Sequence, residues 1–257
     1  MQLQLVPLLQ KQREIYTLPI GFERFRAYLQ VMADPEGGGV ALPPLVAMNP
    51  MGKPHIAELL DRLLALGAEE IAATAVANAA ARLAPLLSTL RVGLVVSDDL
   101  LGGWTNRYFS EMGFRLDGMY AVRNGWATVP IWMSESWDAG AICAATLIAI
   151  YRTLYMQRFG KPQTLDQILA QEGMAGRFAA ISEPQLDPDD LDYTREILAA
   201  YRMASELPVV FACLYGDEAA RSVGYPPVGL SPRAGLALAL AEAYEQALTP
   251  EQALNKR

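Results

Sequence analysis

Histidine and cysteine are scarce in this chain. Its 257 residues contain one histidine, His55, and two cysteines, Cys143 and Cys213. A metal site built on several histidines is excluded by this count. The cysteines lie far apart and form no Cys-x-x-Cys pair, so the sequence indicates neither a zinc knuckle nor a disulfide framework. We therefore expect a reducing, cytoplasmic location.

Positive charge is also scarce. Twenty-one Lys and Arg residues stand against 28 Asp and Glu residues, which gives a formal net charge of -7. This balance opposes attraction to nucleic acid or to an anionic membrane surface, and no basic run reverses it locally. We expect neither nucleic acid nor membrane as a partner. The start, MQLQLVPLLQKQRE, also lacks the basic segment of a secretory signal.

Long apolar runs are missing as well. The most apolar segment, Ala139 to Met156, has about a dozen uninterrupted apolar residues before Arg152, fewer than the roughly 20 that a membrane-spanning helix needs. It is predicted to be a buried helix.

Several catalytic signatures are missing too. We find no P-loop, no dinucleotide fingerprint after a strand, no G-x-S-x-G and no HExxH. No internal repeat and no convincing linker divides the chain, which predicts a single domain over residues 1–257.

Strand-like and helix-like segments alternate along the chain. From Pro54, apolar residues recur with the spacing of one helical face, and Gly67 ends that helix. The runs Arg91 to Ser97 and Leu207 to Leu214 are predicted to be buried strands, and Val40 to Met48 an edge or irregular strand because of its prolines.

Two Gly-containing dipeptides predict an antiparallel meander. Asp117-Gly118 and Asn124-Gly125 separate short apolar runs between Phe114 and Met133, and such pairs supply the positive φ angles of tight hairpins. Further on, a capping box at Thr164 starts a short helix that Gly173 should end. The expected fold is a mixed α/β domain, helix-rich, with a central sheet of parallel strands plus this meander, covered by helices.

The only histidine lies in a loop that leads into a helix. In AMNPMGKPHIAELL, Gly52 lets the backbone approach a ligand, the helix start offers free N–H groups, and Lys53 adds a positive charge. Asn49, Lys53 and His55 are therefore candidates for binding an anion, and His55 for moving a proton. The alternative is an exposed histidine in a first helical turn, without a function.

A second candidate loop follows the strand Arg91 to Ser97. Asp98 and Asp99 end this strand, and Asn106 and Arg107 start the next helix. Neighbouring carboxylates can act as acid and base or hold Mg²⁺, because adjacent charges push their pKa values apart. The same residue types also make turns and caps, which is the structural alternative. The cofactor stays unknown, with Mg²⁺ allowed by an all-oxygen site.

All four tryptophans lie close together in sequence: Trp104, Trp126, Trp132 and Trp137. Trp104 and Trp132 are candidates for the wall of a ligand pocket, with Glu135, Asn106 and Arg107 at its rim. Core packing and a homodimer interface are the two alternatives, since tryptophan is common in both.

Together these candidates predict a cytoplasmic enzyme that acts on a small anionic or polar metabolite by hydrolytic or acid–base chemistry. His55, Asp98 and Asp99 are the expected catalytic residues. The competing hypothesis is a non-catalytic protein that binds a small ligand or assembles as a homodimer.

Overall fold

The computed structural model describes residues 1–33, 39–86, 88–101, 106–182 and 186–255, with no account of the Asp117 side chain. The chain forms two compact units, one of Met1–Ser110 and Tyr120–Ile150, the other of Glu111–Met119 and Tyr151–Arg257. That both units belong to one domain stays a prediction. The described chain is mixed α/β and 61% helical.

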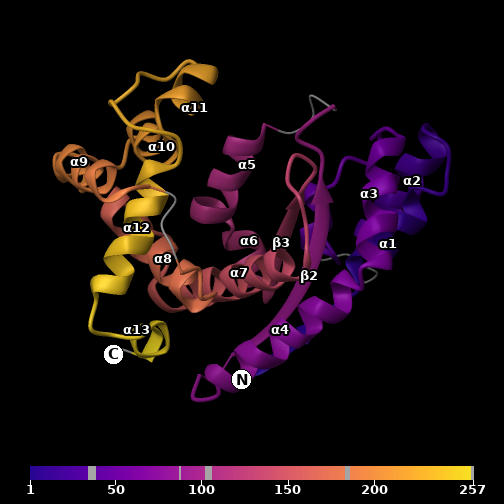
Figure 1. Cartoon of the computed structure of the whole chain (residues 1–257). Coiled ribbons are helices and arrows are strands. Elements are labelled where there is room, and N and C mark those ends of the chain that lie inside the picture. Colours follow the sequence, from indigo (N-terminus) through magenta and orange to yellow (C-terminus); the bar gives the residue numbers. More distant parts are fainter. Residues whose placement is uncertain (34–38, 87, 102–105, 183–185, 256–257) are drawn as a thin grey trace. The chain divides into compact units, whose positions relative to one another are not determined.

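The first unit contains a three-stranded parallel sheet in the order β1-β2-β3 (Figure 1). Its strands are β1 (Gln2–Leu5), β2 (Thr89–Ser97) and β3 (Trp126–Trp132). β2 is the central strand, and its residues from Val92 onward are buried. Such burial on both faces explains the continuous apolar run, since a strand with one wet face would alternate. The prediction of a buried strand at Arg91 to Ser97 is confirmed.

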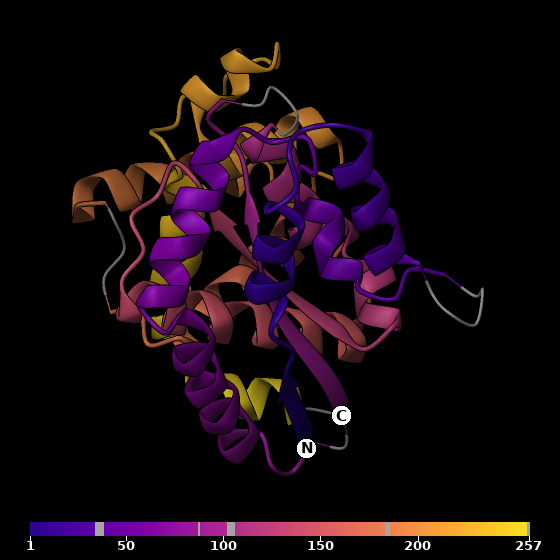
Figure 2. The same cartoon turned by 90° about the vertical axis from the view of Figure 1, so that its right-hand side faces the viewer.

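Helices cover one face of this sheet. In Figure 2, α1, α3 and α4 lie in front of the strands. The first four helices are α1 (Leu8–Ile15), α2 (Phe22–Met32), α3 (Pro54–Ala65) and α4 (Ala68–Arg82). In α3 the apolar stripe predicted from the sequence is buried at Ile56, Leu59, Leu60 and Leu63, and Gly67 follows it with a left-handed φ of 74°.

The antiparallel meander predicted from the sequence is wrong. Met119–Arg123 is a helix, α6, after the π-helical segment η2 (Gly113–Asp117), and β3 pairs with β2 in parallel. Asn124-Gly125 ends α6 instead of closing a hairpin: the Asn124 amide donates to Tyr120 O at 3.1 Å, and Gly125 has φ 69°. The same left-handed glycine that a hairpin turn needs also terminates a helix.

Two further strand predictions are wrong. Leu207–Tyr215 is a helix, α10, with a proline in its first turn and Gly216 at its end. Pro43–Ala47 is a 3-10 helix, η1, in which both prolines are buried. Short apolar runs do not distinguish a buried strand from a buried helix, so their packing decides.

The second unit is helical, and its centre is the contact of α8 (Leu165–Phe178) with α12 (Ala234–Glu245). Gly173 does not end α8 as the sequence predicts. A Cβ at Gly173 would lie 2.0 Å from Ala239 O, so this glycine allows the two backbones to approach closely. The unit also contains α9 (Pro188–Ala199), α11 (Asp217–Ser222) and α13 (Pro250–Asn255).

The helices α5 (Arg107–Met112), α6 and α7 (Ala139–Phe159) contain residues of both units. Among the described helices, α7 by itself has the length and apolarity of a membrane span. Half of its most apolar 18-residue stretch is buried. The buried core helix of a globular protein has the same properties.

Gln12 completes the hydrogen bonding of β2 beyond the end of β1. β1 pairs with β2 as far as Val92, after which the chain turns into α1. The Gln12 side chain then donates to Val96 O at 2.8 Å and accepts from Val96 N at 2.9 Å. The buried amide side chain of Gln12 thus takes the place of one residue of a neighbouring strand. It does so four residues further along β2 than Val92, the last residue that pairs with β1.

We expect Gln12→Ala to destabilise the protein by about 2–4 kcal/mol, because it leaves both polar groups of the Val96 peptide buried without partners. Urea unfolding measures this loss. Gln10→Ala, on the exposed side of the same helix, is the matched control and should stay within about 0.5 kcal/mol of the parent. Equal stabilities for the two variants would contradict the role given to Gln12.

Candidate functional site

Both loops proposed from the sequence, together with the loop that follows β3, meet at the carboxyl ends of β2 and β3. Ser97 is the register partner of Trp132, and the Met133 amide donates to Ser97 O at 3.2 Å. The loop after β2 therefore lies beside the loop after β3. The loop that precedes α3 reaches the same place through His55. In α/β proteins this edge of a sheet is where ligands usually bind.

His55 faces the buried carboxylate of Asp98. His55 Nε2 lies 3.0 Å from Asp98 Oδ2, and the side chains are 18% and 0% exposed, respectively. The ring N–H is not aligned with the oxygen, so neither atom has a linear hydrogen bond within the described part of the chain. Loose geometry of this kind is common in acid–base pairs that tighten when substrate binds.

Asp98 is held as an anion by its other oxygen. The amides of Leu100 and Leu101 both donate to Asp98 Oδ1 at 3.1 Å. Burial raises the pKa of Asp98, but these amide hydrogen bonds and the contact with His55 outweigh it and lower the pKa below its ordinary value. The carboxylate is therefore charged at neutral pH and turned toward the imidazole.

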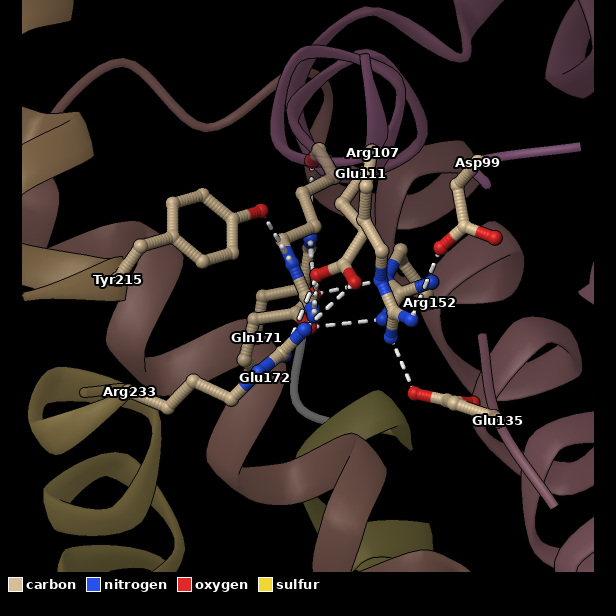
Figure 3. A network of polar contacts seen from close by, with 10 residues as sticks. Asp99, Arg107, Glu111, Glu135, Arg152, Gln171, Glu172, Tyr215 and Arg233 are labelled. Atoms are coloured by element: carbon tan, nitrogen blue, oxygen red, sulfur yellow. Dashed lines mark hydrogen bonds and ion pairs between the residues drawn. The ribbon is translucent and has the colours of Figure 1, made fainter. Parts of the chain in front are cut away.

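Asp99 and Arg107 form a separate clasp between the two loops (Figure 3). Asp99 Oδ1 accepts from the Ser134 amide at 3.0 Å, and its Oδ2 accepts from Ser134 Oγ at 2.5 Å and lies 3.4 Å from Arg107 Nη1. Arg107 also donates to Ser134 Oγ at 2.7 Å and pairs with Glu135. These contacts engage Asp99, Arg107 and Glu135 with protein groups and favour a structural role for them.

Asn49 and Lys53 lie on opposite sides of the loop that carries His55. Asn49 is buried, and its Oδ1 accepts from the Met51 amide at 3.0 Å. Lys53 is exposed and occupies the N-cap position of α3, without a capping hydrogen bond from its side chain. Of the two, Lys53 is the residue that faces solvent.

Tyr16 and Arg24 hold this loop in place, and the sequence suggested neither of them. The Tyr16 hydroxyl donates to Asn49 O, and burial raises the Tyr16 pKa strongly. The Arg24 guanidinium donates to Gly52 O at 3.0 Å and to Leu18 O at 2.7 Å, and it lies 5.1 Å from the centre of the Tyr16 ring. No pattern in the sequence links these helices to the loop, because contacts between distant segments leave no local signal.

The tryptophans singled out in the sequence have different surroundings in the structure. Trp132 is buried, and Arg107 lies over its ring at 5.1 Å from the centre. Trp126 is also buried, and the Trp137 indole donates to Trp132 O at 2.9 Å. Trp104 lies outside the described residues. The burial of Trp126 and Trp132, at the two ends of β3, agrees with the core-packing alternative.

Asn106 acts as a helix cap. Its Oδ1 accepts from the Phe109 amide at 3.1 Å at the start of α5, which is the capping alternative considered for this loop.

The described side chains contain no group of three or more His, Cys, Asp or Glu residues arranged to hold a metal ion. Both oxygens of Asp99 already accept from Ser134, and Asp98 faces His55 and two amides. An Mg²⁺ site at these aspartates stays a prediction.

Comparisons of the chain with protein-family models, with curated proteins and with solved structures find no match.

The lowered pKa of Asp98 predicts how stability depends on pH. A carboxylate with a lowered folded-state pKa contributes stability that is fully present above its unfolded pKa, near 3.8, and is lost as the pH falls through the lower folded value. We therefore expect Asp98→Asn to cost about 1–3 kcal/mol at pH 7 and less at pH 3.

Urea unfolding at both pH values measures the difference. Glu58→Gln, an exposed change on the same helix as His55, is the control and should alter stability by no more than about 0.5 kcal/mol at either pH. A cost of Asp98→Asn that is the same at pH 7 and pH 3 would rule out a carboxylate stabilised in its charged form.

Proposed function

We propose that the protein is an enzyme that performs general acid–base chemistry on a small polar or anionic metabolite, with His55 as the group that moves the proton. The observation that supports this most is the 3.0 Å approach of His55 Nε2 to the buried, charged Asp98. A carboxylate on one ring nitrogen fixes the tautomer and leaves the other nitrogen for the substrate.

In this proposal Asp98 holds the Nε2–H of His55, and Nδ1 carries the lone pair. No hydrogen bond to His55 Nδ1 occurs within the described residues. With 18% of its side chain exposed, the ring can reach a bound molecule. Nδ1 would take a proton from water or from a substrate O–H group and return it to a leaving group, which covers hydrolysis and proton abstraction.

The substrate is proposed to be anionic because of the groups beside His55. Lys53 places an exposed ammonium group at the start of α3, where the helix dipole also favours negative charge. Ser134, Asp99 and Arg107 would hold the neighbouring loops in position, with Asn49, Asn106, Trp132 and Glu135 around them. We also propose a cytoplasmic location, without nucleic-acid or membrane partners.

The alternative is a non-catalytic protein that binds a small ligand or assembles as a homodimer. The specific observation in its favour is the clasp: Asp99 and Arg107 contact each other and Ser134, as structural residues do. A dimeric mass by light scattering together with an absence of turnover would support this alternative.

The enzymatic proposal predicts a loss of turnover in two variants. The protein is incubated with a defined mixture of carboxylated and phosphorylated metabolites, and depletion is followed by mass spectrometry. His55→Gln should slow the consumption of any depleted compound about 10²–10⁴-fold, the usual contribution of a general acid–base group. Asp98→Asn should also slow it, because the imidazole loses its orienting carboxylate.

Lys11→Gln, on α1, serves as the control and should leave consumption unchanged. Equal consumption by the parent and His55→Gln, or no consumption by the parent across the mixture, would contradict the proposal.

A further inference from the structure

Helix α1 is attached to both chain segments that carry the proposed acid–base pair. The carboxylate of the pair follows the end of β2, and the imidazole lies in the first turn of α3. Gln12 of α1 holds Val96 of β2, two residues before Asp98. Tyr16, one helical turn after Gln12, donates to Asn49 O in the loop that leads to the imidazole. One face of a single helix therefore contacts both halves of the pair.

The attachment to Asp98 leaves its carboxylate little freedom. The buried Gln12 side chain bonds both the N–H and the C=O of Val96, which fixes the end of β2 against α1. The amides of Leu100 and Leu101 then hold Asp98 Oδ1 from the other side. The backbone before Asp98 and one of its oxygens are thus both fixed, so the direction of Oδ2 is determined.

The attachment to the imidazole acts through a tight turn. The Gly52 amide donates to Asn49 O at 3.0 Å, and the Met51 amide donates to Asn49 Oδ1 at 3.0 Å. The oxygen of Asn49 that closes the turn is also the acceptor of the Tyr16 hydroxyl. Tyr16 therefore grips the turn at the atom on which its geometry depends.

Little slack separates this turn from His55. A Cβ at Gly52 would lie 2.2 Å from Ile56 Cδ1 and 3.2 Å from the Tyr16 hydroxyl oxygen, so the turn packs directly on α3 and on Tyr16. Pro54 is the first residue of α3, and its ring fixes the backbone φ immediately before His55. A shift of the turn is therefore passed on to the imidazole.

Arg24 supports the same turn from α2. Its Nη1 donates to Gly52 O at 3.0 Å, and its Nε donates at 2.7 Å to Leu18 O, just beyond the end of α1. The residue is 6% exposed, and it pairs with no carboxylate in the described part of the chain. Burying a guanidinium is costly unless its donors are satisfied. Here the donors are used to fasten the turn to the α1 segment.

The Tyr16 hydroxyl is kept neutral and able to donate. Burial raises its pKa strongly, Arg24 and Gln12 lower it by less, and the charge of Asp98 raises it further. The influence of Asp98 also shows that Tyr16 lies within electrostatic reach of the pair.

We infer that α1 sets the separation of His55 and Asp98, with Tyr16 as the positioning residue for the imidazole and Gln12 as the positioning residue for the carboxylate. The catalytic meaning of this inference rests on the function proposed for His55. The contact itself can be measured without turnover. A misplacement of about 1 Å can slow a reaction about 10²-fold, so a residue that touches neither reacting group can still control the rate.

The tautomer of the only histidine, measured by NMR at a pH where the imidazole is neutral, tests the inference. Tyr16→Phe keeps the ring and removes the hydroxyl. We expect the population with the proton on His55 Nδ1 to rise at least about twofold over that in the parent, because the contact with Asp98 loosens. The loss of a hydrogen bond with a purely structural role would lower stability without changing this ratio.

Tyr120→Phe is the matched control. The Tyr120 hydroxyl accepts from the Val40 amide at 3.1 Å, and Tyr120 lies in α6, before the amino end of β3. This variant also loses a hydroxyl that bonds the backbone of a distant segment, but it should leave the tautomer of His55 unchanged. Urea unfolding confirms that each variant is folded under the conditions of the NMR measurement.

Two further variants test the attachment at other points. Arg24→Lys keeps the charge but cannot bond both carbonyls with a planar fork, and it should shift the tautomer in the same direction as Tyr16→Phe. Gln12→Ala, which loosens the end of β2, should do the same. If Tyr16→Phe does not fold, Arg24→Lys decides.

Turnover separates this inference from the proposed function. For any compound that the parent consumes, Tyr16→Phe should lower kcat about 10–10²-fold and leave KM within about twofold, because the position of the proton-transfer group changes and the contacts of the ligand do not. An unchanged tautomer in folded Tyr16→Phe, or an equal shift in Tyr120→Phe, would overturn the inference even if the parent is active. A shifted tautomer with an unchanged kcat would overturn the role of Tyr16 in the reaction. A shifted tautomer in a chain that consumes nothing would leave the positioning by α1 intact and remove the proposed function.

Discussion

The parallel pairing of β2 with β3 is the constraint on which the candidate site depends. Because both strands run in the same direction, their carboxyl ends lie at one edge of the sheet, where Ser97 is opposite Trp132. Asp98 and Asp99 leave this edge from one strand and Ser134 from the other. α3 then needs only to place His55 above β2 for the imidazole to meet Asp98.

Asp98 and Glu172 each keep a negative charge in a buried position, but different groups stabilise the two charges. Asp98 stays charged in a buried position because two backbone amides donate to one oxygen and His55 approaches the other. Glu172 stays charged because two arginines surround it. In both cases hydrogen bonds and opposite charge outweigh burial, which otherwise favours the neutral acid. In the proposed function, the first arrangement serves proton transfer.

The sequence predicted those features that have a local cause. Apolar spacing predicted the buried face of α3, and a continuous apolar run predicted β2. It failed where one local signal serves two structures: Asn124-Gly125 fits a hairpin as well as the end of a helix, and the apolar run Leu207 to Leu214 fits a strand as well as α10. β1 was missed because four residues are too few to show a period.

From the sequence, His55 could be placed only in a loop at a helix start, and Asp98 only in a loop at a strand end. Their contact could not be predicted beyond that. The clasp of Asp99 with Ser134, the support from Tyr16 and Arg24, and the network around Glu172 could not be predicted. The residues of that network of ion pairs lie on or beside different helical segments: Arg115, Arg152, Glu172 and Arg233. Their local sequences give no sign that tertiary packing brings them together.

The tautomer of the only histidine tests the account most directly. Long-range proton–nitrogen correlation in NMR, at a pH where the imidazole is neutral, reports which ring nitrogen of His55 carries the proton, and a chain with a single histidine gives an unambiguous signal. The contact with Asp98 predicts one dominant tautomer, with the proton on Nε2 and a bare Nδ1, and a change in this preference in Asp98→Asn. A proton on Nδ1, or the same averaged mixture in the parent and in Asp98→Asn, would contradict the pairing of His55 with Asp98.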